Sequence, residues 1–254
     1  MRLPISILLL FVSNCLIAQQ QNIVSKVFNW GNVQHTNSVK AVSTSLFSGK
    51  GAVLTSHKLN GVSIAAGKNI QFKNTLQQER FFIMKNGIVT IELNGTTTDL
   101  NRGSVVGVMP GEKINFINNS SKKIELYEML YQSETPDIER AQKAGGSFIT
   151  HWDDIAFKPH DKGGVRQFFD RPTAMLNRFD IHVTTLNVGF KSHDPHTHKN
   201  EEIILMLEGN AEMQIGTTHQ KANAGDAVYL ESNILHNLTN VGSTPCLYFA
   251  IQWN

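Results

Sequence analysis

Residues 189–202 read Gly-Phe-Lys-Ser-His-Asp-Pro-His-Thr-His-Lys-Asn-Glu-Glu and lead into an apolar run. On a strand, side chains at positions i and i+2 share a face, so His196 and His198 can direct two imidazoles at one point. Glu202 begins the apolar run, and His236 follows far along the chain. Three neutral imidazoles and one carboxylate suit a first-row divalent ion and leave positions free for water or substrate. We therefore predict a metal site formed by His196, His198, Glu202 and His236.

Two spaced motifs surround these four residues. The pattern Gly-x6-His-x-His-x3-Glu-x6-Gly begins at Gly189, and Gly-x10-His-x3-Asn begins at Gly225. Together they resemble the paired motifs of the cupin family, although the first gap is one residue longer than usual. Glu231 and Asn233 stand where the family commonly carries Pro and Gly, which affects a turn and not a ligand. The resemblance implies a double-stranded β-helix, a jelly-roll barrel closed from two antiparallel sheets.

The chain also contains an internal repeat. A shift of 122 residues brings the two halves into register and aligns turn glycines, which are needed where φ is positive or backbones approach closely. We therefore expect an all-β fold of two tandem cupin barrels, a bicupin, with a short helical connector. The matched pairs are Gly67 with Gly189, Glu79 with Glu201, Gly87 with Gly209, Gly103 with Gly225, and Asn118 with Asn240.

The same shift shows that the first half lacks the four predicted ligands. Asn74, Leu76, Arg80 and Ile114 stand at the positions of His196, His198, Glu202 and His236, respectively. None of the four is a usual ligand, and Arg80 would place a positive charge where the metal should be. We expect the N-terminal barrel to be metal-free and structural. A pocket for a small anion around Asn74 and Arg80 is the alternative, because arginine suits carboxylate recognition.

The N-terminus has the pattern of a secretory signal. Arg2 precedes the apolar residues 5–12, a stretch too short to span a bilayer, and a small residue, Ala18, is the expected cleavage site. We therefore expect a periplasmic or extracellular protein; lipidation at Cys15 is the alternative. Once the leader is removed, Cys246 remains as a single thiol, which leaves no intramolecular disulfide to form.

The repeat and the leader together predict the domain boundaries. The chain of 254 residues accommodates two barrels of ordinary domain size. The predicted segments are a signal peptide at 1–18, a degenerate barrel at 19–132, a connector at 133–160 that includes a short helix over 136–143, and a metal-binding barrel at 161–254.

Composition limits the classes of partner. The protein is 41% apolar and 17% charged, with a formal net charge of +2. This balance offers no electrostatic case for binding nucleic acid or an anionic membrane. We expect a small-molecule substrate as the partner, and self-association into a homo-oligomer stays open.

A divalent ion with one carboxylate ligand would bind and polarise anionic oxygen. Within the family this permits oxidation of a chelating enol or diketone, isomerisation, decarboxylation and C–N hydrolysis. The candidate bases are Glu201, which alternation predicts to point away from the metal, and His182, which faces either the cavity or solvent. Arg166 and Arg171 precede the barrel and would bind a substrate carboxylate if either folded over its mouth; otherwise they are surface residues.

The resemblance extends to overall layout. Bicupins with metal only in the C-terminal barrel are similar to the ureidoglycine aminohydrolases, which bind manganese and a ureido acid, although the ligand pattern there differs. We expect one divalent metal per chain, manganese first, with iron, nickel or zinc as alternatives. The sequence thus predicts a secreted metal-dependent enzyme for a small polar, oxygen-rich metabolite. A non-catalytic binder of a metal–carboxylate complex or a sugar is the alternative, and a structural cupin is a third.

Overall fold

The computed structural model describes residues 21–32 and 42–254, so the predicted leader at 1–18 lies outside the described residues. Strands dominate this part of the chain, and the expected all-β fold of two barrels is confirmed. Its one α-helix, α1 (Ile138–Lys143), begins after the N-cap Asp137, whose carboxylate accepts a hydrogen bond from the backbone N–H of Arg140. No helix over residues 21–32 and 42–254 is long and apolar enough to cross a membrane.

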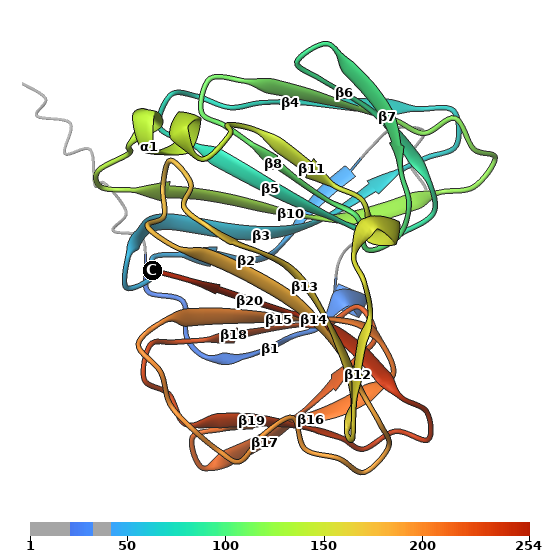
Figure 1. Ribbon diagram of the computed structural model, residues 1–254, viewed down its shortest axis with the longest axis vertical. Coiled ribbons are helices and arrows are strands. Elements are labelled where there is room, and N and C mark those ends of the chain that lie inside the picture. The colour runs from blue at the N-terminus through green and yellow to red at the C-terminus, as the bar shows by residue number, and fades with distance from the viewer. Residues whose placement is uncertain (1–20, 33–41) are drawn as a thin grey trace, which may run out of the picture.

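Each barrel pairs one large antiparallel sheet with one small one (Figure 1). In the first barrel the large sheet has the order β11-β8-β5-β10-β3-β2 and the small sheet β4-β9-β6-β7. The bounds of these strands are β2 (Val42–Gly49), β3 (Leu54–Ile64), β4 (Asn69–Lys73), β5 (Glu79–Asn86), β6 (Val89–Leu93), β7 (Thr96–Leu100), β8 (Val105–Val108), β9 (Lys113–Ile117), β10 (Ile124–Ser133) and β11 (Phe148–Thr150).

The second barrel repeats this plan. Its large sheet has the order β1-β18-β15-β20-β14-β13-β12 and its small sheet β17-β16-β19. The bounds are β1 (Lys26–Phe28), β12 (Lys158–His160), β13 (Gly163–Arg171), β14 (Phe179–Leu186), β15 (Glu201–Glu208), β16 (Asn210–Ile215), β17 (Thr218–Asn223), β18 (Ala227–Leu230), β19 (His236–Asn240) and β20 (Cys246–Trp253).

The two large sheets face each other in the middle of the molecule, and the small sheets lie outside (Figure 1). Period-2 alternation divides each central strand between two cores. Ile203 and Leu205 of β15 join the core shared by the barrels, whereas Ile204 and Met206 point into the second barrel. Burying both faces explains why this strand reads as a continuous apolar run.

The 122-residue repeat holds at the level of strand register. Arg80 of β5 pairs with Leu130 on one side and Val108 on the other. Glu202 of β15 pairs with Gln252 and Leu230, the residues 122 positions further along. A residue of one barrel can therefore be compared directly with its counterpart in the other.

The barrels exchange their first strands. β1 pairs with β18 of the second barrel, Lys26 opposite Tyr229, and β11 pairs with β8 of the first barrel, Phe148 opposite Gly107. These positions also differ by 122, so each repeat gives its opening strand to the other barrel. The segment 133–160, expected as a connector, thus supplies strands to both sheets, and each exchanged strand covers a sheet edge that would otherwise be unpaired.

A tryptophan follows each exchanged strand and fixes it to the opposite barrel. The backbone N–H of Trp30 donates to Asp226 at 2.8 Å, and that of Trp152 donates to the Ser104 hydroxyl at 3.0 Å. Each indole lies against a positive-φ glycine, at which an added Cβ would crowd the tryptophan; these glycines are Gly225 and Gly103.

Candidate metal centre

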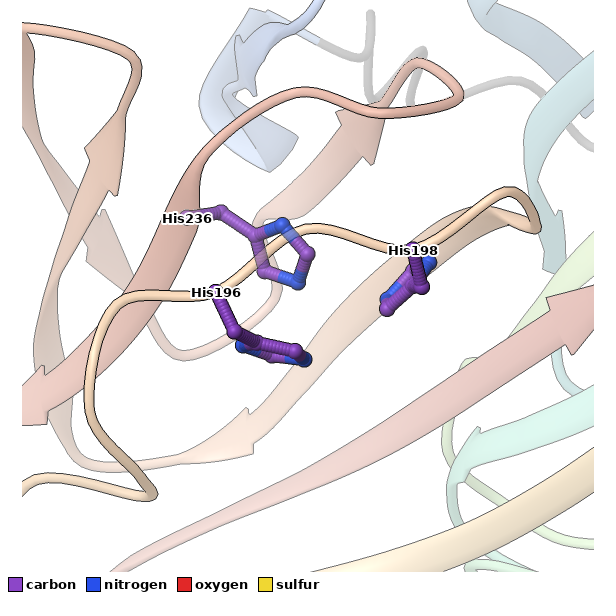
Figure 2. A group of neighbouring side chains, drawn as sticks. All are labelled: His196, His198 and His236. Carbon is purple, nitrogen blue, oxygen red and sulfur yellow. The ribbon is translucent and has the colours of Figure 1, made fainter.

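Three imidazoles converge at the end of the second barrel (Figure 2). One ring nitrogen from each of His196, His198 and His236 lies within 4.8 Å of the others. His196 and His198 lie in the extended loop before β15, and not on a regular strand. That loop is held in place because His196 and His236 exchange backbone hydrogen bonds of 3.2 and 3.0 Å.

The fourth predicted ligand lies beside the imidazoles. Glu202 is 5% exposed, and its Oε2 lies 3.1 Å from Nε2 of His198 and 3.3 Å from Nε2 of His236. The first contact is a hydrogen bond; the second lacks hydrogen-bond geometry. The structure therefore brings all four predicted residues together at the place where β15 and β19 begin.

Backbone carbonyls select the ring tautomers. Nδ1 of His198 lies 2.9 Å from the carbonyl oxygen of Asn200, and Nδ1 of His236 lies 2.9 Å from that of Ile234. A carbonyl only accepts, so Nδ1 carries a proton in both rings, and the neutral ring of His236 presents the Nε2 lone pair to the cluster. His198 donates from Nε2 as well, to Glu202, and would give up that proton to bind a metal ion. Nε2 of His236 and Nδ1 of His196 are buried without a hydrogen-bond partner among the described residues. Such orphaned donor atoms around a carboxylate fit a divalent metal ion.

The carboxylate of Glu202 is ionised, and the pKa values of His196 and His198 are shifted in opposite directions. Burial opposes ionisation of Glu202, but the hydrogen bond from His198 and the nearby His236 outweigh it and lower the pKa of Glu202 to about 2. The hydrogen bond to Glu202 raises the pKa of His198. Burial, together with the neighbouring imidazoles, lowers the pKa of His196. A buried negative charge among basic nitrogens is suited to a cation.

The cluster opens into a cavity of about 270 Å³ inside the second barrel. Apolar side chains such as Ile204, Met213 and Leu238 line part of it. None of the lining residues in the described part of the chain is lysine or arginine. The remaining polar lining comes from the barrel strands and the loop at its mouth: His160, His182, Thr184, Ser192, His193, Tyr248 and Gln252.

The two candidate bases lie in different places. His182 lines the cavity from β14, so of the two expected orientations the one toward the cavity is observed. Glu201 points to the opposite face of β15, where its carboxylate accepts hydrogen bonds from the Tyr229 hydroxyl, the Trp253 indole and the backbone N–H of Ala52. Its candidacy as a base is wrong, because alternation turns it into the core between the barrels.

The counterpart of Glu201 supports a structural role. Glu79, 122 residues earlier, accepts hydrogen bonds from the backbone N–H groups of Ala174 and Met175, and Ala174 is the counterpart of Ala52. Both glutamates are buried. Each glutamate therefore bonds a loop of the other repeat and belongs to the contact between barrels.

The two arginines considered for substrate binding do not line the cavity. Arg166 stacks on Trp152 and Phe157, with its guanidinium 4.6 and 4.9 Å from the ring centroids. Arg171 stacks on Phe148 at 4.2 Å and donates to backbone carbonyls near the end of α1. Both brace the exchanged segment instead.

Several contributors to the cavity escaped sequence reasoning, His160, Thr184 and Ala250 among them. Ala250 of β20 lines it, and only its small size distinguishes it in the sequence. His193, placed at the barrel mouth by its position in the loop, lies edge-on to His196 with ring centroids 4.0 Å apart. The repeat held a signal for Ala250: the first half has the much larger Glu128 at the same position, so the alanine leaves space in the second barrel.

Residues 182–252 match the family model described as a cupin domain. The second barrel is a cupin domain. A search of curated protein sequences found no match. The cupin motifs carry the four converging residues, so the family assignment and the site rest on the same stretch of chain.

Solved structures extend the resemblance of fold to the whole chain. Oxalate decarboxylase from Lactobacillus farciminis, solved as a formate complex, aligns with a TM-score of 0.67 at 13% identity, covering 93% of this chain and 88% of that one. AerE from Microcystis aeruginosa gives 0.66 at 13%, covering 91% and 97%. Salicylate 1,2-dioxygenase from Pseudaminobacter salicylatoxidans gives 0.62 at 12%, covering 94% and 86%. At such identities the likeness is one of fold.

Proposed function

We propose that this two-barrel cupin is a metal-dependent enzyme acting on a small, polar, oxygen-rich metabolite. The observation that carries the proposal is the convergence of three histidines and an ionised glutamate at a cavity of about 270 Å³. Tautomers selected by backbone carbonyls and unpartnered ring nitrogens indicate ligands prepared for a cation.

His196, His198, Glu202 and His236 would hold the ion, one per chain, with manganese as our first choice and iron, nickel or zinc as alternatives. A bound divalent ion supplies a Lewis acid that polarises carboxylate, enolate or carbonyl oxygen. The chain's own contribution is to orient the substrate and limit water. Glu202 supplies the only carboxylate among the cavity-lining residues described, and His182, two strands away on the same sheet, is placed to accept or donate a proton.

The size and lining of the cavity favour a compact substrate. It falls slightly below the usual range of 300–1,000 Å³ for ligand pockets, roughly the space for a metabolite of few heavy atoms. Two proteins of similar fold carry names that involve small carboxylates, an oxalate decarboxylase bound to formate and a salicylate dioxygenase. They support decarboxylation and oxygenation as the first reaction classes to assay.

We place the enzyme in the periplasm or outside the cell. Support comes from the sequence alone, in the charged start, the apolar residues 5–12 and the small residue Ala18. Identifying the mature N-terminus of protein recovered from the export fraction tests this placement, which would be abandoned if the protein retained Met1 and stayed inside.

Elemental analysis of the purified protein, beside His196→Ala, tests the metal centre. We expect close to one ion per chain, lost in the variant. Turnover is then assayed with small hydroxy, keto and dicarboxylic acids, under air and without oxygen, for each metal. Turnover lost in Glu202→Gln supports the enzyme. Ligand binding without turnover for every metal would instead identify a binding protein.

A further inference from the structure

The first barrel holds a carboxylate of its own where the second barrel has its cavity. Glu128 of β10 is 2% exposed and points into the barrel. Its Oε1 accepts a hydrogen bond from Nε of Arg80 at 2.6 Å, and its Oε2 accepts one from the Asn60 amide at 2.9 Å. The Ser43 hydroxyl lies 3.5 Å from the same Oε2. The first barrel thus has a carboxylate bound between a cation and a polar donor.

Strand register makes each of these residues the counterpart of a cavity-lining residue of the second barrel. Glu128 pairs with Asn60, and Ala250 pairs with His182, both 122 residues later. The alanine leaves open the space that the glutamate side chain fills in the first barrel. The two residues His182 and Ala250 both line the cavity.

The cation is also matched. Arg80, which contacts the Glu128 carboxylate, has Glu202 as its counterpart, the residue that would hold the metal. In the first barrel a guanidinium provides the positive charge, and in the second a divalent ion would provide it. The positive charge therefore lies at equivalent positions in the two barrels, next to Glu128 in the first and next to Ala250 in the second.

We infer that the substrate carries a carboxylate group, which binds beside Ala250 between the metal and the ring of His182, as Glu128 binds between Arg80 and Asn60. This inference rests on the proposed function and specifies its substrate class. Ala250 is the specificity-determining residue, because its size decides whether the carboxylate comes from the ligand or from the chain. His182 lines the cavity next to Ala250, where a ligand can reach it.

The lining favours a carboxylate over a phosphate. A phosphate monoester brings about two negative charges near neutral pH. With no lysine or arginine among the described lining residues, the second charge would face only Glu202 and neutral groups. A monoanionic carboxylate matches the single cation and the neighbouring ring of His182.

The test uses the full chain loaded with Co²⁺ and titrated calorimetrically with acetate, acetamide and inorganic phosphate. We expect acetate to bind and the other two to bind more than about tenfold more weakly, the value of one charge-assisted hydrogen bond. Ala250→Glu, which installs the residue of the first barrel, should retain the metal and lose acetate binding. Thr217→Glu adds a carboxylate on an exposed turn and should leave acetate binding intact.

A second pair of variants keeps the inference open to contradiction if Ala250→Glu fails to fold. His182→Leu should weaken acetate binding about tenfold, whereas His182→Asn, with the donor found in the first barrel, should retain most of it. Equal binding of acetate and acetamide, or unchanged acetate binding in Ala250→Glu, overturns the inference. A wild-type protein that binds no metal would instead overturn the proposed function.

Discussion

The two barrels share a register, yet their interiors differ in volume and charge. In the first, Phe72, Phe82 and Phe116 pack ring against ring, with centroids 4.8–6.0 Å apart. In the second, the corresponding core contains Ala211, Ala222 and Ala250, and a cavity remains. The fold is the same, so the capacity to bind a ligand lies in which side chains point inward.

The two barrels also differ in whether the buried carboxylate is paired with a fixed positive charge. In the first barrel Arg80 and Glu128 neutralise each other at 2.6 Å, with side-chain exposures of 13% and 3%. In the second, Glu202 faces histidines whose ring nitrogens remain available. The first barrel is electrostatically closed, whereas the second is suited to an added cation.

The largest expected effect is on metal affinity. Removing a group that only supports a metal ligand lowers metal affinity by roughly 10–100-fold. His198→Ala removes a ligand itself, so we expect it to lower metal affinity by more than that. Leu76→Ala changes the counterpart in the first barrel, which is 71% exposed, and should retain about one ion per chain. Competition titration against a chelator measures both. Equal affinities in the two variants would contradict the assignment of the ligands.

The next effect is on the stability of the first barrel. Glu128→Ala leaves the largely buried guanidinium of Arg80 without its carboxylate partner, with Lys73 and Asn74 still accepting from it, which should reduce the free energy of unfolding by about 3 kcal/mol. Replacing both residues by leucine should recover most of the loss. Urea unfolding measures the difference. A loss below about 1 kcal/mol would mean that the pair behaves like an exposed salt bridge.

Much of this organisation could be read from the sequence because it is expressed in spacing. The repeat aligned Gly103 with Gly225, and both have positive φ because they occupy the same turn in the two halves. The four converging residues His196, His198, Glu202 and His236 were selected by residue type and interval, and the structure places them together. Such features can be predicted from the sequence because each depends on the spacing of a few residue types along the chain.

The exchange of β1 and β11 could not be read in the same way. Three-residue strands such as Lys26–Phe28 are too short to show periodicity, and their partners lie far along the chain. The shared spacing of Trp30 and Trp152 was the available signal. The partner of Arg80 was also hidden, because Glu128 lies on another strand. The alternative of a small-anion pocket at Arg80 is thereby corrected, since the anion is the protein's own carboxylate.

A smaller effect separates the role of Glu201 from that of Glu202. Glu201→Gln replaces a carboxylate that accepts hydrogen bonds from Tyr229, Trp253 and Ala52 with an amide that presents a donor to donors. We expect the free energy of unfolding to fall by about 1–3 kcal/mol, with metal content unchanged. Glu79→Gln is the matched variant in the first repeat and should behave similarly. Elemental analysis and urea unfolding measure both, and loss of turnover in a stable Glu201→Gln protein would restore its candidacy as a base.

In the core between the barrels, His57 stands at the position that corresponds to Phe179 of the second repeat. His57 is fully buried among aromatic rings, with centroids of Phe47 and Trp253 at 5.3 and 5.1 Å, and both ring nitrogens lack partners among the described residues. His57→Phe should therefore raise the free energy of unfolding at neutral pH by roughly 1–3 kcal/mol, because two unsatisfied polar atoms are removed.

Its pH dependence has a definite sign. Burial lowers the pKa of His57 to about 3 from an ordinary value of 6.5. Below pH 6.5 the unfolded chain takes up a proton that the folded chain resists until about pH 3, so the free energy of unfolding of the wild type falls as the pH is lowered through this window. Other acidic groups titrate in both proteins, so the difference between wild type and His57→Phe isolates this residue. The difference should widen as the pH is lowered from 6.5 to 4 in urea unfolding series, and parallel curves would contradict the burial of a neutral imidazole between the barrels.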